Sequence, residues 1–222
     1  MNKADVLKLL EVCTFKDIFT SEDSYHDVII PLEEAEKSTI ECDAGATKLV
    51  LWIPNFDEYV IKIPFTGVYE EDWIKGDKGY LWQGEKYREY FGAYDGWDYC
   101  YVETSLYADA VREGVDQFFL KTSFLGYIKG HPIYIQPKAV EFYEVPHKIS
   151  PEEKQESHKI CRECRISLKP EWVLDAIRCY GLSQVKKLFA FINEYQIEDL
   201  HGDNLGYYKD KPVIIDYAGF NS

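Results

Sequence analysis

Residues 199–216 read DLHGDNLGYYKDKPVIID, a stretch that places Asp, His, Asp and Asn within six residues and ends on another Asp. Asp199 and Asn204 lie five positions apart in a polar loop after a predicted helix. A turn and an apolar strand then lead to Asp216, which we place at the end of a buried strand. Because an unpaired buried carboxylate is costly, Asp216 needs a partner, and Mg²⁺ is a suitable one. Asn204 and Asp216 are therefore the predicted metal ligands, and Asp199 is predicted to orient or deprotonate a hydroxyl group.

The composition limits the class of protein. The chain has 222 residues, of which 46% are hydrophobic, and this is enough for one large domain or two small lobes. Lys and Arg total 25 against 39 Asp and Glu, and the resulting net charge of -14 disfavours a nucleic-acid partner. No apolar run approaches the roughly 18–20 residues that span a bilayer, so no membrane partner is predicted.

The N-terminal segment and the cysteines indicate the compartment. Residues 1–13, MNKADVLKLLEVC, have the pattern of an amphipathic helix and lack the apolar centre of a signal peptide. The six cysteines are scattered along a chain that is too large to depend on disulfide staples. We therefore predict an acidic, cytoplasmic protein with reduced cysteines.

Hydrophobic periodicity predicts an α+β protein. The predicted elements are, in chain order, a helix at 3–12, a strand at 27–32, three strands between 38 and 65, a helix at 99–113, strands at 117–128 and 132–142, a helix within 146–170, helices at 170–180 and 182–196 with Ser183 as N-cap of the latter, and a hairpin of strands at 205–208 and 213–216. This order favours an N-terminal extension at 1–37, a sheet-rich N-lobe at 38–145 and a reduced helical C-lobe at 146–222. Residues 66–98 are rich in Trp, Tyr and Gly, and we expect an insertion that either packs on the N-lobe or presents an aromatic surface to a protein partner.

A lysine inside a predicted strand and a glutamate on the next helix form a second candidate pair. Lys62 lies in the middle of residues 59–65, YVIKIPF, where its charge should be matched by an anionic group. Glu103 on the following helix is the preferred partner, and Glu113 is its rival on the same helix. A Lys–Glu pair near phosphates, with a Gly-containing turn before it, is the arrangement that phosphoryl transfer uses.

These residues belong to a set of motifs with a familiar order. VIK at 60–62 matches the strand lysine of V-A-I-K, and IYIQPKA at 133–139 lies where a hinge strand would join two lobes. DLHGDN at 199–204 matches D-x-H-x-x-N. VIID at 213–216, followed by YAG, resembles the D-F-G element. Over roughly residues 38–219 the chain resembles the protein-kinase-like superfamily. The most similar branch is that of aminoglycoside phosphotransferases, choline kinases and ubiquinone-biosynthesis kinase-like proteins.

The resemblance implies a two-lobed kinase-like fold with ATP and Mg²⁺ as cofactors. Lys62 would contact the α- and β-phosphates of ATP, and Glu103 would hold Lys62 in place. Asp199 would be the catalytic aspartate, and Asn204 and Asp216 would bind Mg²⁺. The expected activity is an ATP-dependent phosphotransferase that acts on a hydroxyl of a small molecule or a protein.

The resemblance also implies how the nucleotide is held. Backbone groups around Ile135, Gln136 and Lys138 would meet the adenine, and Gly45 would belong to a turn that covers the phosphates. That turn has one glycine where the family has two or three, and only three residues follow Gly219. The alternative function is therefore a catalytically inactive pseudokinase that acts as a binding or regulatory module.

Two other features have simpler interpretations. His201 lies within the DLHGDN loop, and a structural role in hydrogen-bonding that loop is preferred to a catalytic one. Cys161 and Cys164 have zinc-ligand spacing, with His158 and His147 as further ligands of such a site. The preferred alternative is a charged helix on which the two cysteines share a face.

Overall fold

The computed structural model describes residues 3–12, 41–44, 47–53, 56–64, 98–128 and 131–218. The strand predicted at 27–32, Gly45, Gly219 and all of the aromatic insertion except Asp98 lie outside the described residues. By its internal contacts the chain divides into two compact units, which are described separately below. The first comprises Met1–Tyr101 and Thr122–Pro137, and the second comprises Val102–Lys121 and Lys138–Ser222.

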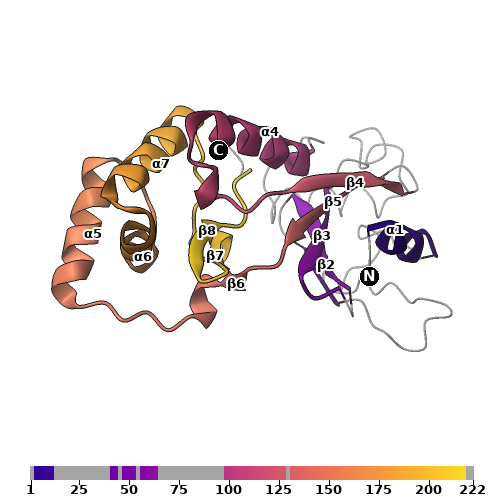
Figure 1. Cartoon of the computed structure of the whole chain (residues 1–222), viewed down its shortest axis with the longest axis horizontal. Helices are drawn as coiled ribbons and strands as arrows, with labels where there is room; N and C mark the ends of the chain where they lie inside the picture. Colours follow the sequence, from indigo (N-terminus) through magenta and orange to yellow (C-terminus); the bar gives the residue numbers. More distant parts are fainter. Residues whose placement is uncertain are drawn as a thin grey trace, which may run out of the picture. The chain divides into compact units, whose positions relative to one another are not determined.

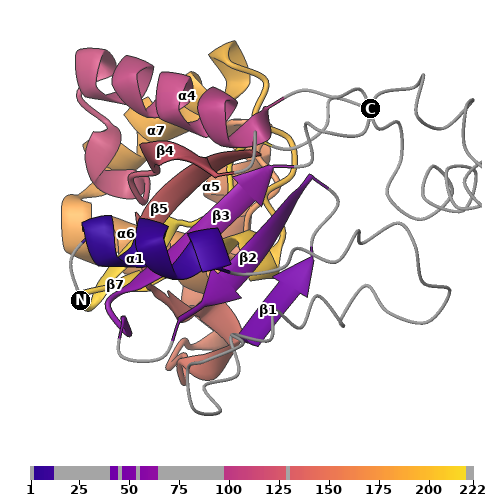
Figure 2. The same cartoon turned by 90° about the vertical axis from the view of Figure 1, so that its right-hand side faces the viewer.

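The first unit is built on a five-stranded antiparallel sheet in the order β1-β2-β3-β5-β4. Its elements are α1 (Lys3–Val12), β1 (Glu41–Ala44), β2 (Lys48–Trp52), β3 (Tyr59–Pro64), β4 (Ser123–Ile128) and β5 (His131–Pro137). Helix α1 lies across the sheet, as Figure 2 shows, and its Val6 and Leu10 are buried. The strands are apolar on one face, where Leu51, Ile61 and Ile135 are buried, because alternate side chains point to opposite faces.

The second unit combines helices with a small antiparallel sheet in the order β6-β7-β8. Its elements are α4 (Tyr99–Glu113, of which the first turn belongs to the first unit), η1 (Asp116–Phe118), β6 (Val140–Glu141), η2 (Phe142–Glu144), α5 (Pro151–Glu163), α6 (Pro170–Tyr180), α7 (Leu182–Glu194), η3 (Gly202–Asn204), β7 (Leu205–Tyr208) and β8 (Lys211–Ile214). Helix α6 packs against β8 (Figure 1). The core includes Phe118, Trp172, Leu188, Leu205 and Ile214, each of which is fully buried.

Local sequence features explain where the helices begin and end. Ser150 and Glu153 form a capping box at the start of α5, and Pro170 is the first residue of α6. Gly181, with φ of 85°, ends α6 and is also the N-cap of α7. The prediction that Ser183 caps this helix is therefore wrong. Glycine reaches positive φ without strain, and this allows two helices to meet at one residue.

The C-terminal hairpin differs by two residues from the prediction. Lys209 and Asp210 form its turn with φ values of 51° and 61°, as a tight two-residue hairpin requires. Strand β8 therefore begins at Lys211 and ends at Ile214. The prediction that Asp216 is the last residue of the strand is wrong, because Asp216 follows two residues after its end.

The coarse fold class is confirmed, since helices are combined with antiparallel sheets in one α+β chain. The finer expectation of a two-lobed kinase-like fold, with lobes at 38–145 and 146–222, stays a prediction. Among the described residues, no helix combines the length and the apolar composition that a membrane crossing needs.

Candidate functional site

The loop at 199–204 is closed by one of its own side chains. The Asn204 side-chain amide donates to the backbone oxygen of Asp199 at 2.7 Å, and the Asn204 N–H donates to the backbone oxygen of His201 at 3.1 Å. With its NH₂ group bound in this way, Asn204 retains Oδ1 as the atom that could ligate a cation. The Asn204 side chain therefore holds the two ends of the 199–204 loop together.

The same residue connects the loop to the segment that carries Asp216. The Ile215 N–H donates to the backbone oxygen of Asn204 at 2.8 Å, which extends the β7–β8 pairing of Leu205 with Ile214 by one residue. The two predicted metal ligands thus lie at the same end of one hairpin. Asp216 is half-buried, and the buried Tyr217 follows it and donates from its hydroxyl to the backbone oxygen of Leu120 at 3.1 Å. This anchor fixes the chain on the far side of Asp216.

Asp199 presents its carboxylate to solvent, because its side chain is 47% exposed. His201 lies between two carboxylates, with Nε2 3.4 Å from Asp199 Oδ1 and Nδ1 3.2 Å from Asp203 Oδ2. Asn204 Nδ2 is 3.3 Å from His201 Nε2. Both ring nitrogens of His201 therefore face polar groups of the same loop. This geometry is suited to the structural role that we expected for His201.

Lys62 and Glu103 are both deeply buried, but they belong to different compact units. Lys62 is 2% exposed on β3, and Glu103 on α4 is fully buried. Their pairing stays a prediction. In the first unit, strand register places Lys48 on the same sheet face as Lys62, since Lys48 lies opposite Pro64 and Val50 lies opposite Lys62.

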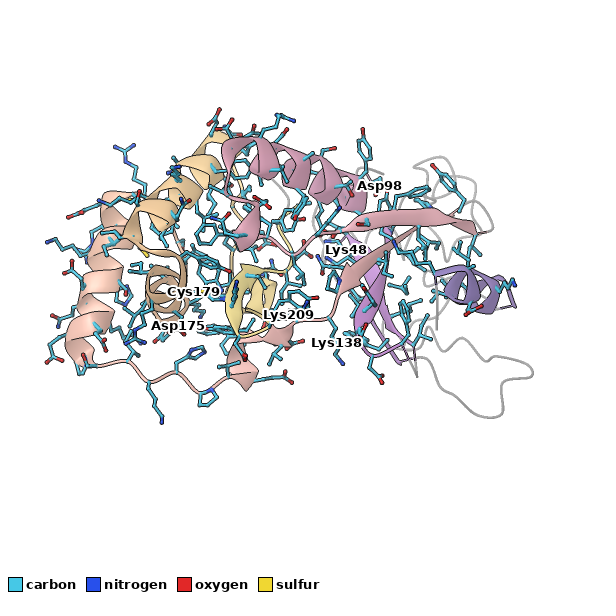
Figure 3. All side chains as sticks on the ribbon, in the orientation of Figure 1. Lys48, Asp98, Lys138, Asp175, Cys179 and Lys209 are labelled. Carbon is cyan, nitrogen blue, oxygen red and sulfur yellow. The ribbon has the colours of Figure 1, made fainter. Side chains whose placement is uncertain are left out.

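Lys48 was missed in the sequence analysis, and it is buried to the same extent as Lys62. Tyr134, opposite Lys62 on β5, shares this face, and its hydroxyl donates to Asp98 Oδ2 at 2.6 Å. Burial, and then the Asp98 carboxylate, raise the pKa of Tyr134, so that its hydroxyl stays a protonated donor. Figure 3 labels Lys48 on β2 and Asp98 at the start of α4. One face of the sheet therefore carries two buried ammonium groups and a tyrosine hydroxyl.

The predicted adenine-contacting residues lie at and beyond the end of β5. Ile135 is opposite Ile61 and belongs to the apolar face, while Gln136 is buried and donates from Nε2 to Thr122 Oγ1 at 3.0 Å. Lys138 is exposed immediately after the strand, where Figure 3 labels it. Gly45, the predicted phosphate-covering residue, lies outside the described residues.

The cysteines and histidines of the zinc alternative are not collected into one site. Cys161 is buried on α5, and this burial raises the pKa of its thiol to about 11. His147 instead stacks on Phe142 and lies 3.5 Å from Asp175 Oδ2. Within the described ranges, no group of three or more His, Cys, Asp or Glu residues is placed to hold a metal ion. Mg²⁺ commonly takes only one or two protein ligands, and water and phosphate supply the rest. A search for three or more protein ligands therefore does not test a Mg²⁺ site made of Asn204 and Asp216.

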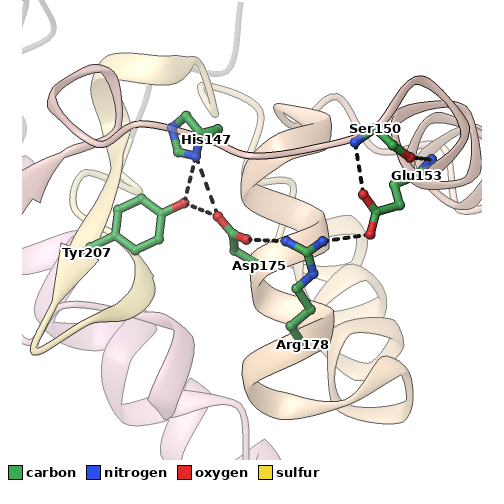
Figure 4. Close-up of polar contacts among 6 residues, drawn as sticks. All are labelled: His147, Ser150, Glu153, Asp175, Arg178 and Tyr207. Carbon is green, nitrogen blue, oxygen red and sulfur yellow. Dashed lines mark hydrogen bonds and ion pairs between the residues drawn. The ribbon is translucent and has the colours of Figure 1, made fainter.

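A polar network in the second unit was also missed (Figure 4). Asp175 accepts from the Tyr207 hydroxyl at 2.8 Å and from Arg178 at 3.2 Å. Arg178 also binds Glu153 at 2.6 Å, which joins α6 to α5. Of these contacts only the Asp175–Arg178 pair, three residues apart on α6, has a local sequence pattern. The other partners are distant along the chain.

A comparison with protein-family models finds none that matches this chain, and a comparison with curated proteins finds no match either. The functional interpretation therefore depends on the residues and on their geometry.

Proposed function

We propose that this chain is a kinase-like protein that binds ATP with Mg²⁺ and transfers phosphate to a hydroxyl of a small molecule or protein. The observation that carries the proposal is the hydrogen bond from Ile215 N–H to Asn204 O. It holds the end of the D-x-H-x-x-N loop beside the residue that precedes Asp216. An amide oxygen and a carboxylate at one end of a hairpin are suitable ligands for a cation that also binds phosphate oxygens.

Four residues have a defined part in the proposed reaction. Asp199 accepts a hydrogen bond from the acceptor hydroxyl, and its exposed carboxylate is accessible to such a group. Lys62 supplies positive charge to the nucleotide phosphates, and its strand holds the ammonium group in a buried position. Asn204 and Asp216 would hold Mg²⁺, which would supply positive charge beside the phosphates. Because these residues belong to both compact units, the test of the proposal includes variants from each unit.

The second candidate function is nucleotide binding without turnover. Residues 43–47, DAGAT, which we expected to cover the phosphates, contain a single glycine, and a segment with few glycines brings fewer backbone N–H groups close to phosphates. Weak cover of the phosphates permits binding through Lys62 and Mg²⁺ but disfavours transfer. This candidate corresponds to a pseudokinase that acts as a binding or regulatory module.

The test is a thermal-shift titration with ATP in the presence and absence of Mg²⁺. A ligand at a hundredfold excess over its Kd stabilises the folded state by about 2.7 kcal/mol. We expect a Mg²⁺-dependent shift that Asp216→Asn loses and that Lys62→Met reduces. Asp210→Asn at the other end of the hairpin is the control for Asp216, and it should retain the shift.

ADP release in the presence of candidate hydroxyl compounds then separates the two functions. Turnover that Asp199→Asn abolishes and Glu198→Gln retains supports transfer, whereas a nucleotide shift without turnover supports the module. The absence of any Mg²⁺-dependent shift at millimolar ATP would contradict both.

A further inference from the structure

A pocket of about 530 Å³ lies in the second unit between the η2 segment, α5 and the start of α6. Its lining includes Phe142, Tyr143, His147, Lys154, His158 and Lys169. The volume falls in the range of small-molecule sites in proteins. None of the residues to which we assign ATP or Mg²⁺ lines it, so the inference below does not depend on the proposed function.

The lining carries an excess of positive groups in a chain whose net charge is -14. Lys154 Nζ binds Glu171 Oε1 at 2.7 Å, and this pair accounts for the carboxylate among the lining residues. Lys169 Nζ lies 5.5 Å from the centre of the Tyr143 ring. A contact with an aromatic face leaves the ammonium charge uncompensated, and an anionic group on a ligand could pair with it.

The His147 side chain, which lines the pocket, is held in place by contacts at both ring nitrogens and on its ring face. The His147 ring stacks on Phe142 with centroids 4.2 Å apart, and its Nε2 is 2.9 Å from the backbone oxygen of Phe142. Its Nδ1 faces Tyr207 Oη at 3.4 Å and Asp175 Oδ2 at 3.5 Å (Figure 4). An imidazole fixed at both nitrogens needs little further ordering when a ligand binds.

Tyr143 adds an aromatic surface to the lining of the pocket. Tyr143 is 59% exposed, and its ring rests on the backbone of the loop at 199–204, because a Cβ added at Gly202 would overlap it. An exposed ring beside an ammonium group favours a ligand that has both a ring and a negative charge.

We propose that this pocket binds a small aromatic anion, a ring that carries a phosphate or carboxylate group. The anionic group pairs with Lys169, and the ring packs against Tyr143. His147 and its network form the rigid side of the site.

The experiment is calorimetric titration of the full chain with phenyl phosphate, benzoate, inorganic phosphate and phenol in separate runs. We expect phenyl phosphate or benzoate to bind at least about tenfold more tightly than phenol or inorganic phosphate, because only the first two carry both features. Tighter binding of phenyl phosphate than benzoate assigns the anionic group as phosphate, and the reverse assigns it as carboxylate.

Matched variants locate the binding. Lys169→Gln should weaken it by about tenfold or more, the loss expected for one charge-assisted contact, while Lys159→Gln on the exposed side of α5 should leave it unchanged. Tyr143→Leu should weaken it independently, which provides a second variant if the first is poorly folded.

Three results would overturn the inference. They are the absence of binding at millimolar phenyl phosphate and benzoate, equal binding by phenol, and affinity that Lys169→Gln leaves intact. Phenyl phosphate binding that is lost in Asp216→Asn but retained in Lys169→Gln would place the ligand at the hairpin instead. Failure of the ATP titration leaves these outcomes untouched, so the two proposals are tested separately.

Discussion

Removal of the Tyr207 hydroxyl tests whether the Asp175 network stabilises the second unit. The hydroxyl donates to Asp175 Oδ2 at 2.8 Å, and burial, followed by the Asp175 carboxylate, raises its pKa. A hydrogen bond to a charged group contributes about 1.5–3 kcal/mol. Asp175 keeps its bond from Arg178, and its carboxylate is 29% exposed, so water can replace part of what is lost. We therefore expect Tyr207→Phe to cost about 1.5 kcal/mol, the lower end of this range.

The assay is urea unfolding followed by far-UV circular dichroism at neutral pH. With a slope of about 2 kcal/mol per molar urea, the midpoint of the second unit should fall by about 0.75 M. Tyr208→Phe is the control, because Tyr208 is the next residue on β7 and points to the opposite face. Its effect should stay below about 0.5 kcal/mol.

The dependence of stability on alkaline pH provides a second test of the hydrogen bond between Tyr207 and Asp175. A raised pKa in the folded state stabilises the protein fully below the unfolded value of 10.0, and this contribution is lost as the pH rises through the folded value. Tyr207→Phe lacks this titration, so its stability should fall less steeply than that of the wild type above pH 10. Equal midpoints for the two phenylalanine variants, or parallel alkaline profiles for wild type and Tyr207→Phe, would refute the role assigned to this hydroxyl.

Three further predictions concern the same unit. Gly206→Ala places a Cβ against a backbone carbonyl of β6, which cannot rotate away, so unfolding in urea should show a loss of about 2–3 kcal/mol. The pKa of Glu153 is lowered chiefly by the hydrogen bond that its carboxylate accepts from the backbone N–H of Ser150. Ionised Glu153 therefore stabilises the fold above pH 4.5, and this contribution is lost as the pH falls through the pKa of Glu153 in the folded state. The difference in unfolding free energy between wild type and Glu153→Gln should therefore shrink in acid. Burial raises the pKa of Cys161 to about 11, whereas Cys179 is exposed, so peptide mapping after brief iodoacetamide treatment at pH 8 should find Cys179 modified before Cys161.

The elements that the sequence predicts well have strong local determinants. The start of α6 follows from Pro170, and the end of α4 follows from Gly114, which has φ of 67°. Strands β2 and β3 follow from their runs of apolar and β-branched residues. In these cases the neighbouring residues alone favour the observed backbone. The strand predicted at 117–128 is wrong in its first half, because residues 116–118 form a 3-10 helix and β4 begins at Ser123.

The errors occur where local preferences compete. Ser183 is a good N-cap residue, but Gly181 ends the preceding helix and takes that position itself. Lys209 and Asp210 adopt positive φ although neither is glycine, so the length of the turn was misjudged and Asp216 was placed in the strand. A tight turn in this hairpin is determined by strand pairing rather than by its own residues.

The candidate site was predictable only as a linear pattern. The hydrogen bond from Asn204 to Asp199 spans five residues and lies within the motif. By contrast, Tyr207 and Asp175 are 32 positions apart, and Tyr207 and His147 are 60 apart. Contacts at such separation depend on the packing of α6 against the small sheet, which no periodicity encodes.

The central proposal is that Lys62 and the hairpin residues both contribute to the binding of ATP with Mg²⁺. It is tested most directly by NMR of the ¹⁵N-labelled chain, with amide shifts recorded as ATP is added with and without Mg²⁺. Our account predicts Mg²⁺-dependent, saturable changes at Lys62 and its β3 neighbours and at Asn204 and Asp216, all with one dissociation constant. Changes confined to one of these two groups, or their absence at saturating ATP and Mg²⁺, would contradict it.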